Sequence, residues 1–474
     1  MMDGLISVKN IFKLSMPAAL SYATIVLVGV IDLYFIGKLG TTAIAATSIA
    51  VSVCTALYSF LDGVRTSTSV LTAQYWGAQD ETGVRGVLIG ALLFSVVVGF
   101  PALFFAVPVG NFVYWLVGNS DIVANGSAYL GIRLFSVPIV LLTFSLIGFF
   151  RGLHNTLMQL IVSASICIAN IVLDYCLIYG KYGFPQLGVK GAAIATLIAE
   201  GIGLIVAVSM LCGSRLTRHR LSFRIPQFQF LRKHIAMAVE AGLYTGLTSL
   251  AISTFVFLFS VLGTQTLAIY QICSQIFFIT YLPQIGFFAA TSVIVGKLLG
   301  QGNFELITRA VLRASVSALS IAFMLSAITL MCASPLVAAF CSNDRGVVLG
   351  VAAILWLICL DQIVSTLCLV LKGALMGMND TRFIAKVSFI TGYLFFLPLA
   401  YCLGIILKMG LKGGYVAFVA WALLDVSIWS IRFVRKKSRL KAFALLAATE
   451  ASVPASVTQE NTPEPVVVTQ PVQP

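Results

Sequence analysis

A sequence pattern in the first half of this chain recurs in the second half, about 223 residues later. Three separate segments match at nearly one offset, between 222 and 225 residues. The matching segments are Gly63 to Gly77 with Gly286 to Gly300, Gly152 to Thr156 with Gly377 to Thr381, and Gly188 to Gly191 with Gly410 to Gly413. A repeat of this length indicates a duplicated fold whose two copies pack together. Positions where the copies differ chemically are then candidates for function.

Composition places the repeat in a membrane. Hydrophobic residues make up 59% of the chain, charged residues 10%, and the mean hydropathy is +1.01, whereas a soluble domain carries about 25% charged residues. A helix that crosses a bilayer needs about 20 mostly apolar residues. Twelve stretches meet this requirement, six in each copy, near 12–37, 47–73, 87–116, 127–149, 157–179, 188–212, 236–262, 267–296, 306–339, 347–371, 383–407 and 412–434. We predict an all-α membrane protein with twelve transmembrane helices in two six-helix lobes, related by a pseudo-two-fold axis along the membrane normal.

Basic residues divide the chain and orient it. They cluster at 213–235, between the predicted lobes at 1–212 and 236–435, and again in the tail at 436–474, whose composition is that of a disordered segment from about residue 443. Because basic segments stay on the cytoplasmic side, we expect both termini in the cytoplasm and the chain in a bacterial inner (plasma) membrane. The net charge of +13 then reflects topology signals and contacts with anionic membrane lipids rather than with nucleic acid.

Several function classes lack their residues. The ten cysteines form no Cys-x-x-Cys pair; of the three histidines, His154 lies in a repeated loop and His219 and His234 lie in the basic connection. This pattern predicts neither a metal site nor a disulfide scaffold. A Gly-x-x-x-x-Gly-Lys-Ser/Thr loop for nucleotide is also missing. We therefore expect no enzyme activity and no cofactor, so that any pumping would draw on an ion gradient.

One set of polar residues within the spans occurs in the first copy alone. Asp32 lies near the end of the first stretch, Asn170 and Asp174 lie one helical turn apart in the fifth, and Thr196 lies in the sixth. The corresponding residues of the second copy are all apolar: Phe255, Phe395, Leu399 and Phe418. A requirement of the shared scaffold would have kept these positions polar in both copies. We therefore predict a site in the N-terminal lobe, with the C-terminal lobe as its packing partner.

Two carboxylates that face one dehydrated cavity have two uses. Mutual repulsion and desolvation favour their neutral forms, so that proton binding would depend on which side of the membrane the cavity faces. The same oxygens, with an amide carbonyl and a hydroxyl, would instead suit a hard cation such as sodium. The residues leave H⁺ and Na⁺ both open. Pro17, fifteen residues before Asp32, is a hinge candidate, because its counterpart is Glu240 and proline removes a helix hydrogen bond.

Four segments carry a family resemblance, and together they cover about residues 8–435. They are Gly29 to Asp32 with Gly37 to Gly40, Leu71 to Ala78, Arg151 to Thr156, and Leu187 to Thr196. In this order they resemble the multidrug and toxic compound extrusion (MATE) transporters, and within them the DinF-like branch. The resemblance implies a V-shaped pair of six-helix lobes that exports organic, often cationic, compounds in exchange for protons or sodium. It also implies a site for the coupling ion formed by Asp32, Tyr129, Asn170, Asp174 and Thr196.

Each polar residue also has a structural interpretation. Asn170 would bridge helices, Thr196 would bond its own helix backbone, and Tyr129 would lie in the aromatic belt at the membrane surface. Asp62 and Arg65 are three residues apart in the second stretch, which favours a mutual ion pair over contact with a substrate.

Three further acids lie in the spans. Glu200 shares a helix face with the sixth-stretch threonine and is a cavity candidate, as is Asp361 of the tenth stretch. For Asp361 and for Asp425 the structural interpretation is a hydrogen bond. Asp361 lies about a turn from the acid expected in sodium-coupled relatives of another branch, and 247–255 in the seventh stretch holds no carboxylate. Both departures argue against a sodium site in the C-terminal lobe.

These observations favour a monomeric secondary antiporter that exports hydrophobic, often cationic, small organic molecules in exchange for protons or sodium by alternating access. The alternative is a flippase for a lipid-linked precursor, which would be expected to line its central cavity with more cations than Arg65 and Arg133. A membrane enzyme or receptor would need a nucleophile–base pair, a metal constellation or a signalling domain, and the sequence shows none of these.

Overall fold

The computed structural model describes residues 4, 6–115, 120–213, 228–332 and 345–452, and it joins helices by short connections throughout these ranges. Most of the predicted basic connection and the tail from residue 453 lie outside the described residues. The helices are α2 (Val8–Gly37), α3 (Thr41–Gly77), α4 (Glu81–Trp115), α5 (Ser120–Phe135), α6 (Val137–Gly152), α7 (Thr156–Tyr179), α8 (Val189–Gly213), α10 (Phe228–Ser260), α11 (Thr264–Gly300), α12 (Phe304–Met331), α14 (Arg345–Gly377), α15 (Thr381–Phe389), η1 (Ile390–Phe396), α16 (Leu397–Tyr401), η2 (Cys402–Ile406) and α17 (Gly410–Ser452).

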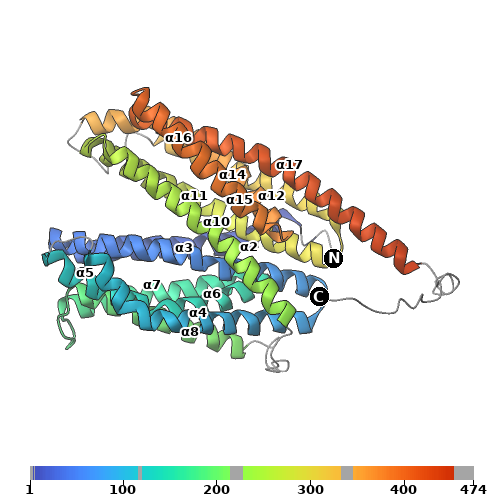
Figure 1. Ribbon diagram of the computed structural model, residues 1–474, viewed down its shortest axis with the longest axis horizontal. Helices are drawn as coiled ribbons and strands as arrows, with labels where there is room; N and C mark the ends of the chain where they lie inside the picture. Colours follow the sequence, from blue (N-terminus) through green and yellow to red (C-terminus); the bar gives the residue numbers. More distant parts are fainter. Residues whose placement is uncertain (1–3, 5, 116–119, 214–227, 333–344, 453–474) are drawn as a thin grey trace, which may run out of the picture.

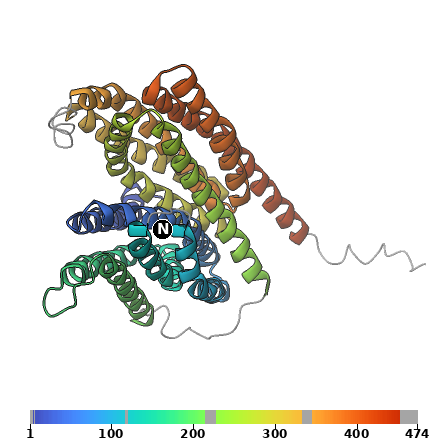
Figure 2. The same cartoon turned by 60° about the vertical axis from the view of Figure 1, so that its left-hand side comes forward.

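The helices form two lobes that meet at one end of the molecule and diverge toward the other (Figure 1). Helices α2 to α8 make the first lobe and α10 to α17 the second, and a view turned by 60° shows the same division (Figure 2). Within the described residues, eleven helices are long and apolar enough to cross a membrane, and the bent pair 126–135 and 137–152 supplies a twelfth span. The predicted two-lobe fold with twelve spans is confirmed.

Four boundaries differ from the predicted ones. The fourth span is bent by 42° at Ser136, where Pro138 near the start of α6 cannot donate a backbone hydrogen bond. Helix α10 begins at Phe228, eight residues before the predicted lobe boundary at 236, so His234 is helical. Helix α17 continues to Ser452, although disorder was predicted from about residue 443. The eleventh span contains two π-helical turns, η1 and η2, which no spacing of apolar residues predicted.

The repeated glycines mark where backbones approach closely, both between the lobes and within them. A Cβ atom on Gly77 would overlap the carbonyl oxygen of Lys297, and one on Gly300 would overlap that of Gln74. Both residues of the second contact lie 223 positions after or before those of the first, so the two contacts are related by the pseudo-two-fold axis. The same symmetry relates Gly63 over Ala238 to Gly286 over Ser15. Only glycine allows helices to cross this closely, which explains why this part of the repeat is retained.

Polar contacts also join the lobes at the end where they meet. The side-chain amides of Gln74 and Asn379 exchange two hydrogen bonds, each of 2.9 Å. His234 of α10 is buried against the first lobe, with its Nε2 2.9 Å from Thr68 Oγ1 and 3.3 Å from Ser67 Oγ. His234 is therefore part of the lobe interface and not of a basic loop.

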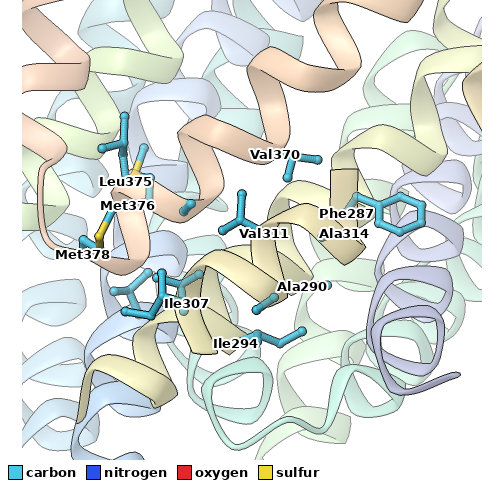
Figure 3. Packing of buried hydrophobic residues seen from close by; sticks show 14 of the residues in the cluster. Phe287, Ala290, Ile294, Ile307, Val311, Ala314, Val370, Leu375, Met376 and Met378 are labelled. Atoms are coloured by element: carbon cyan, nitrogen blue, oxygen red, sulfur yellow. The ribbon is translucent and has the colours of Figure 1, made fainter. Parts of the chain in front are cut away.

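An apolar core lies under these contacts and includes residues of both lobes. Its largest cluster joins Leu14 and Val70 of the first lobe to many residues of the second. Figure 3 shows its centre, where Phe287 of α11, Val311 of α12 and Val370 of α14 pack together. The lobes are thus held together by apolar packing at one end, which leaves the divergent helix ends free to carry separate sites.

Candidate functional site

The structure brings Asp32 and Asp174 together. Helices α2 and α7 pack side by side, and the two carboxyl groups are close enough to hydrogen-bond to one another. Asp174 is fully buried and Asp32 is half-buried. A bond between two carboxyl groups requires a proton on one of them, because an ionised carboxylate only accepts. The pair therefore either shares a proton or places two anions next to each other.

Asn170 and Thr196 lie beside this pair. Asn170, one turn before Asp174, is fully buried and donates from Nδ2 to Thr196 Oγ1 at 3.2 Å. Thr196 in turn donates to the Ala192 carbonyl oxygen at 3.0 Å, so it also makes the backbone bond expected of a structural threonine. Asn170 Oδ1, Asp32 Oδ1 and both oxygens of Asp174 are buried without a donor in the described part of the chain. Buried oxygens of this kind suit a proton or a hard cation.

Helices α5 and α8 add an ion pair to this group. Arg133 Nη1 lies 2.9 Å from Glu200 Oε1, and only 12% and 13% of the two side chains is exposed. Arg133 also interacts electrostatically with Asp32 and Asp174. Tyr129, one turn before Arg133, is buried close to the same acids and not at the membrane surface. We call Asp32, Asp174, Glu200, Arg133, Asn170, Thr196 and Tyr129 the outer cluster; three carboxyl groups against one guanidinium give it excess negative charge.

Arg133 was not among the predicted residues of this site. The available signal was its spacing of four residues from Tyr129, which places both side chains on one helix face. Its pairing with Glu200 depends on how α5 meets α8, and no local pattern contains that information.

The equivalent place in the second lobe is a packed aromatic cluster. Phe255, the counterpart of Asp32, has ring centroids at 4.8 Å from Phe418 and 5.6 Å from Phe396. The predicted counterparts Phe395 and Leu399 are each wrong by one residue, because the π-helical turn η1 adds a residue and changes the offset from 225 to 226. Phe396 and Ala400 take those places. Both are apolar, so the contrast between the lobes at this site remains.

The second lobe has buried charges of its own. Lys372 Nζ lies 2.9 Å from Asp425 Oδ2, with 9% and 4% of the side chains exposed. Their counterparts, at offsets of 225 and 222 residues, are the uncharged Ile147 and Gly203. The prediction that only the first copy carries such a polar set is therefore wrong, since each lobe has charges that the other lacks. Asp361 is buried nearby and accepts a hydrogen bond from Ser365 Oγ at 3.2 Å, as the structural interpretation expects.

Replacing Lys372 by methionine is expected to lower the free energy of unfolding by about 3–5 kcal/mol, because Asp425 becomes a buried anion without a partner. The double variant Lys372→Met/Asp425→Leu should recover most of this loss, since neither charge remains. Denaturant unfolding of the purified variants in detergent measures both effects. A double variant as unstable as the single one would assign the stability to the packing of Lys372 between the Tyr244 and Trp429 rings, each 5.3 Å from Nζ.

The remaining candidates lie away from the outer cluster. Asp62 and Arg65 form the expected ion pair, and Arg65 also donates to Tyr22 Oη at 2.6 Å. Pro17 lies inside α2, where it cannot donate to the carbonyl oxygen of Lys13. Thr156 Oγ1 reaches that oxygen at 3.4 Å, so the helix stays continuous across the proline with one weak bond from α7 in place of its own.

Known proteins decide the family. The family profile described as MatE matches residues 17–176 and again 239–402, which together exceed half of the chain. The chain belongs to the MATE family. The profile matches once in each half, as the internal repeat requires. The DinF-like branch remains a prediction.

Curated MATE relatives align over most of the chain. "Probable multidrug resistance protein NorM" of Photorhabdus laumondii is 24% identical over 416 residues, covering 87% of this chain and 92% of that protein. "Multidrug resistance protein NorM" of Vibrio vulnificus is 26% identical over 431 residues, covering 86% and 91%. A solved structure described as the outward-facing conformation of a multidrug resistance MATE family transporter superposes with a TM-score of 0.85 at 20% identity, covering 92% and 97%. The general role of this MATE protein is therefore membrane transport, and its relatives are transporters rather than enzymes.

Proposed function

We propose that this MATE protein is a secondary antiporter that exports hydrophobic, often cationic, organic compounds in exchange for protons or sodium. The observation that carries the proposal is the Asp32–Asp174 pair, whose buried oxygens have no donor among the described residues. A proton shared by the two acids leaves the pair with one negative charge fewer, and loss of that proton restores two anions that attract a cation. Because proton and cation use the same oxygens, each weakens the binding of the other, which is the coupling that exchange requires.

The charge of the outer cluster supports cation transport over the flippase alternative. Asp32, Asp174 and Glu200 outnumber Arg133, so the cluster attracts positive rather than phosphate-bearing groups. The printed names of the NorM relatives, which describe multidrug resistance, agree with small organic substrates.

The arrangement of the lobes supports alternating access. They meet at the end where α2 and α10 begin (Figure 1), and we propose that this end faces the cytoplasm of a bacterium, with both termini there and the protein acting as a monomer in the inner membrane. Solved MATE structures are described as straight and as bent conformations. We propose that α2 bends at Pro17, where one backbone hydrogen bond is already missing.

Transport by purified protein in proteoliposomes tests the function. A pH gradient and a sodium gradient are imposed separately, and movement of a fluorescent lipophilic cation is followed by stopped flow. We expect one of the two gradients to drive movement against the concentration gradient of the dye, and the effective gradient identifies the coupling ion. Dye movement that neither gradient accelerates would contradict antiport.

A further inference from the structure

A second cluster of buried charge lies deeper in the first lobe and has no part in the proposed exchange. Tyr22 lies ten residues before Asp32 on α2, about 15 Å along the helix axis. Two arginines converge on it, Arg65 from α3 and Arg151 from α6, with exposed fractions of 5% and 1%. Asp62 of α3 pairs with Arg65 at the edge of the group. We call these four residues the inner cluster.

The two guanidinium groups share few acceptors. Tyr22 Oη lies 2.6 Å from Arg65 Nη2 and within hydrogen-bonding reach of Arg151. Arg151 Nε donates to Ser69 Oγ at 2.9 Å. Arg65 Nε and Arg151 Nη2 are buried and have no acceptor among the described residues. Both arginines therefore keep an unused donor inside the lobe.

The charge of the inner cluster is unbalanced. Of the described acids, Asp62 is the one whose charge acts on either arginine, so two cations face one anion. Arginine cannot relieve this by losing its proton. The other buried basic residues discussed above each have an acid of their own, Glu200 for Arg133 and Asp425 for Lys372. An excess of positive charge with free N–H donors is thus specific to the inner cluster.

We propose that the inner cluster binds an oxyanion, a carboxylate or a phosphate, between Arg65 and Arg151. A guanidinium presents paired N–H donors that match the oxygens of such groups, and burial strengthens the interaction. The Phe144 ring, 4.9 Å from Arg65 Cζ, supplies an apolar wall for the body of the ligand. The half-buried Tyr22 and Asp62, with 18% of its side chain exposed, form the accessible edge. A ligand with a cationic and an anionic end about 15 Å apart would reach both clusters.

Two binding experiments separate the sources of the oxyanion. Protein in phosphatidylcholine nanodiscs, in gluconate buffer without halide, is dialysed against radiolabelled benzoate, a soluble carboxylate. Protein in nanodiscs that contain phosphatidylglycerol is released and analysed by native mass spectrometry for a retained lipid phosphate. We expect one bound anion per protein in one of the two arms, and that arm identifies the source.

Three variants show whether the inner cluster is the binding site. Arg151→Gln should weaken binding at least about tenfold, whereas Asp62→Asn, which removes the competing acid, should strengthen it. Arg85→Gln is the matched control, since Arg85 pairs with Glu81 at 3.8 Å on a partly exposed surface and should bind as the wild type does. If Arg151→Gln does not fold, the comparison of Asp62→Asn with the wild type decides alone. Absence of saturable binding in both arms, binding that Arg151→Gln leaves unchanged, or binding that Asp62→Asn does not strengthen would overturn the proposal.

Discussion

Replacing Asp174 by asparagine is expected to reduce gradient-driven export in proteoliposomes by at least about tenfold while the fold stays intact. The carboxamide has nearly the same shape as the carboxyl group but neither takes up nor releases a proton, so the coupling between ion and substrate is lost. Its NH₂ group also offers a permanent donor to the Asp32 carboxyl beside it. Asp32→Asn should have the same effect, because the two acids act as one pair. Initial rates of dye movement under the effective gradient measure the change.

Stability distinguishes a lost site from a damaged fold. Asp174 is fully buried and neither of its carboxylate oxygens has a donor in the described chain, so the neutral variant should unfold at the same or a higher temperature. Glu305→Gln is the control for the same chemical change, since Glu305 is 80% exposed and pairs with Lys441 at the surface. Wild-type export by Asp174→Asn under both gradients would rule out the pair as the coupling site, and a lowered melting temperature would assign the loss to the fold.

The outer cluster shows which parts of a site a sequence of this kind contains. Asp32 and Asp174 could be grouped because acids inside apolar helices are costly and must face one another, a cavity or a donor. Asn170 could be added because one helical turn places it on the face of Asp174. These arguments need only the helix period and the cost of burying charge. They also predicted the two-lobe fold, since the repeat and the apolar stretches lie in the linear sequence.

The partners of the buried cations could not be found in the same way. Arg133 meets Glu200, and Lys372 meets Asp425, across helices that are distant in sequence. Their pairing depends on how each helix is rotated about its axis, which apolar stretches do not determine. The π-helical turn η1 added a second error of the same kind, because one inserted residue moved every later counterpart by one position. Position along a helix was predictable, whereas contact between helices required the structure.

Replacing Gly300 by alanine is expected to destabilise the protein by about 3 kcal/mol or more. The new methyl group would overlap the carbonyl oxygen of Gln74, and a backbone oxygen cannot move away as a side chain can. The overlap lies where α11 of one lobe crosses α3 of the other, so it should separate the lobes at the end where they meet. Gly77→Ala, which meets the Lys297 carbonyl oxygen in the symmetry-related contact, should show a similar loss. Thermal unfolding in detergent measures both.

The matched control is Gly201→Ala on α8. No atom lies within 4 Å of a Cβ at Gly201, so the added methyl group meets open space. Alanine there should raise stability by about 0.5–1 kcal/mol through its higher helix propensity. The same substitution thus has opposite signs at two helical glycines of one protein, and the sign depends only on what the backbone faces. If Gly300→Ala were as stable as Gly201→Ala, the lobes would not be held by close backbone contact, and the glycines of the repeat would need another explanation.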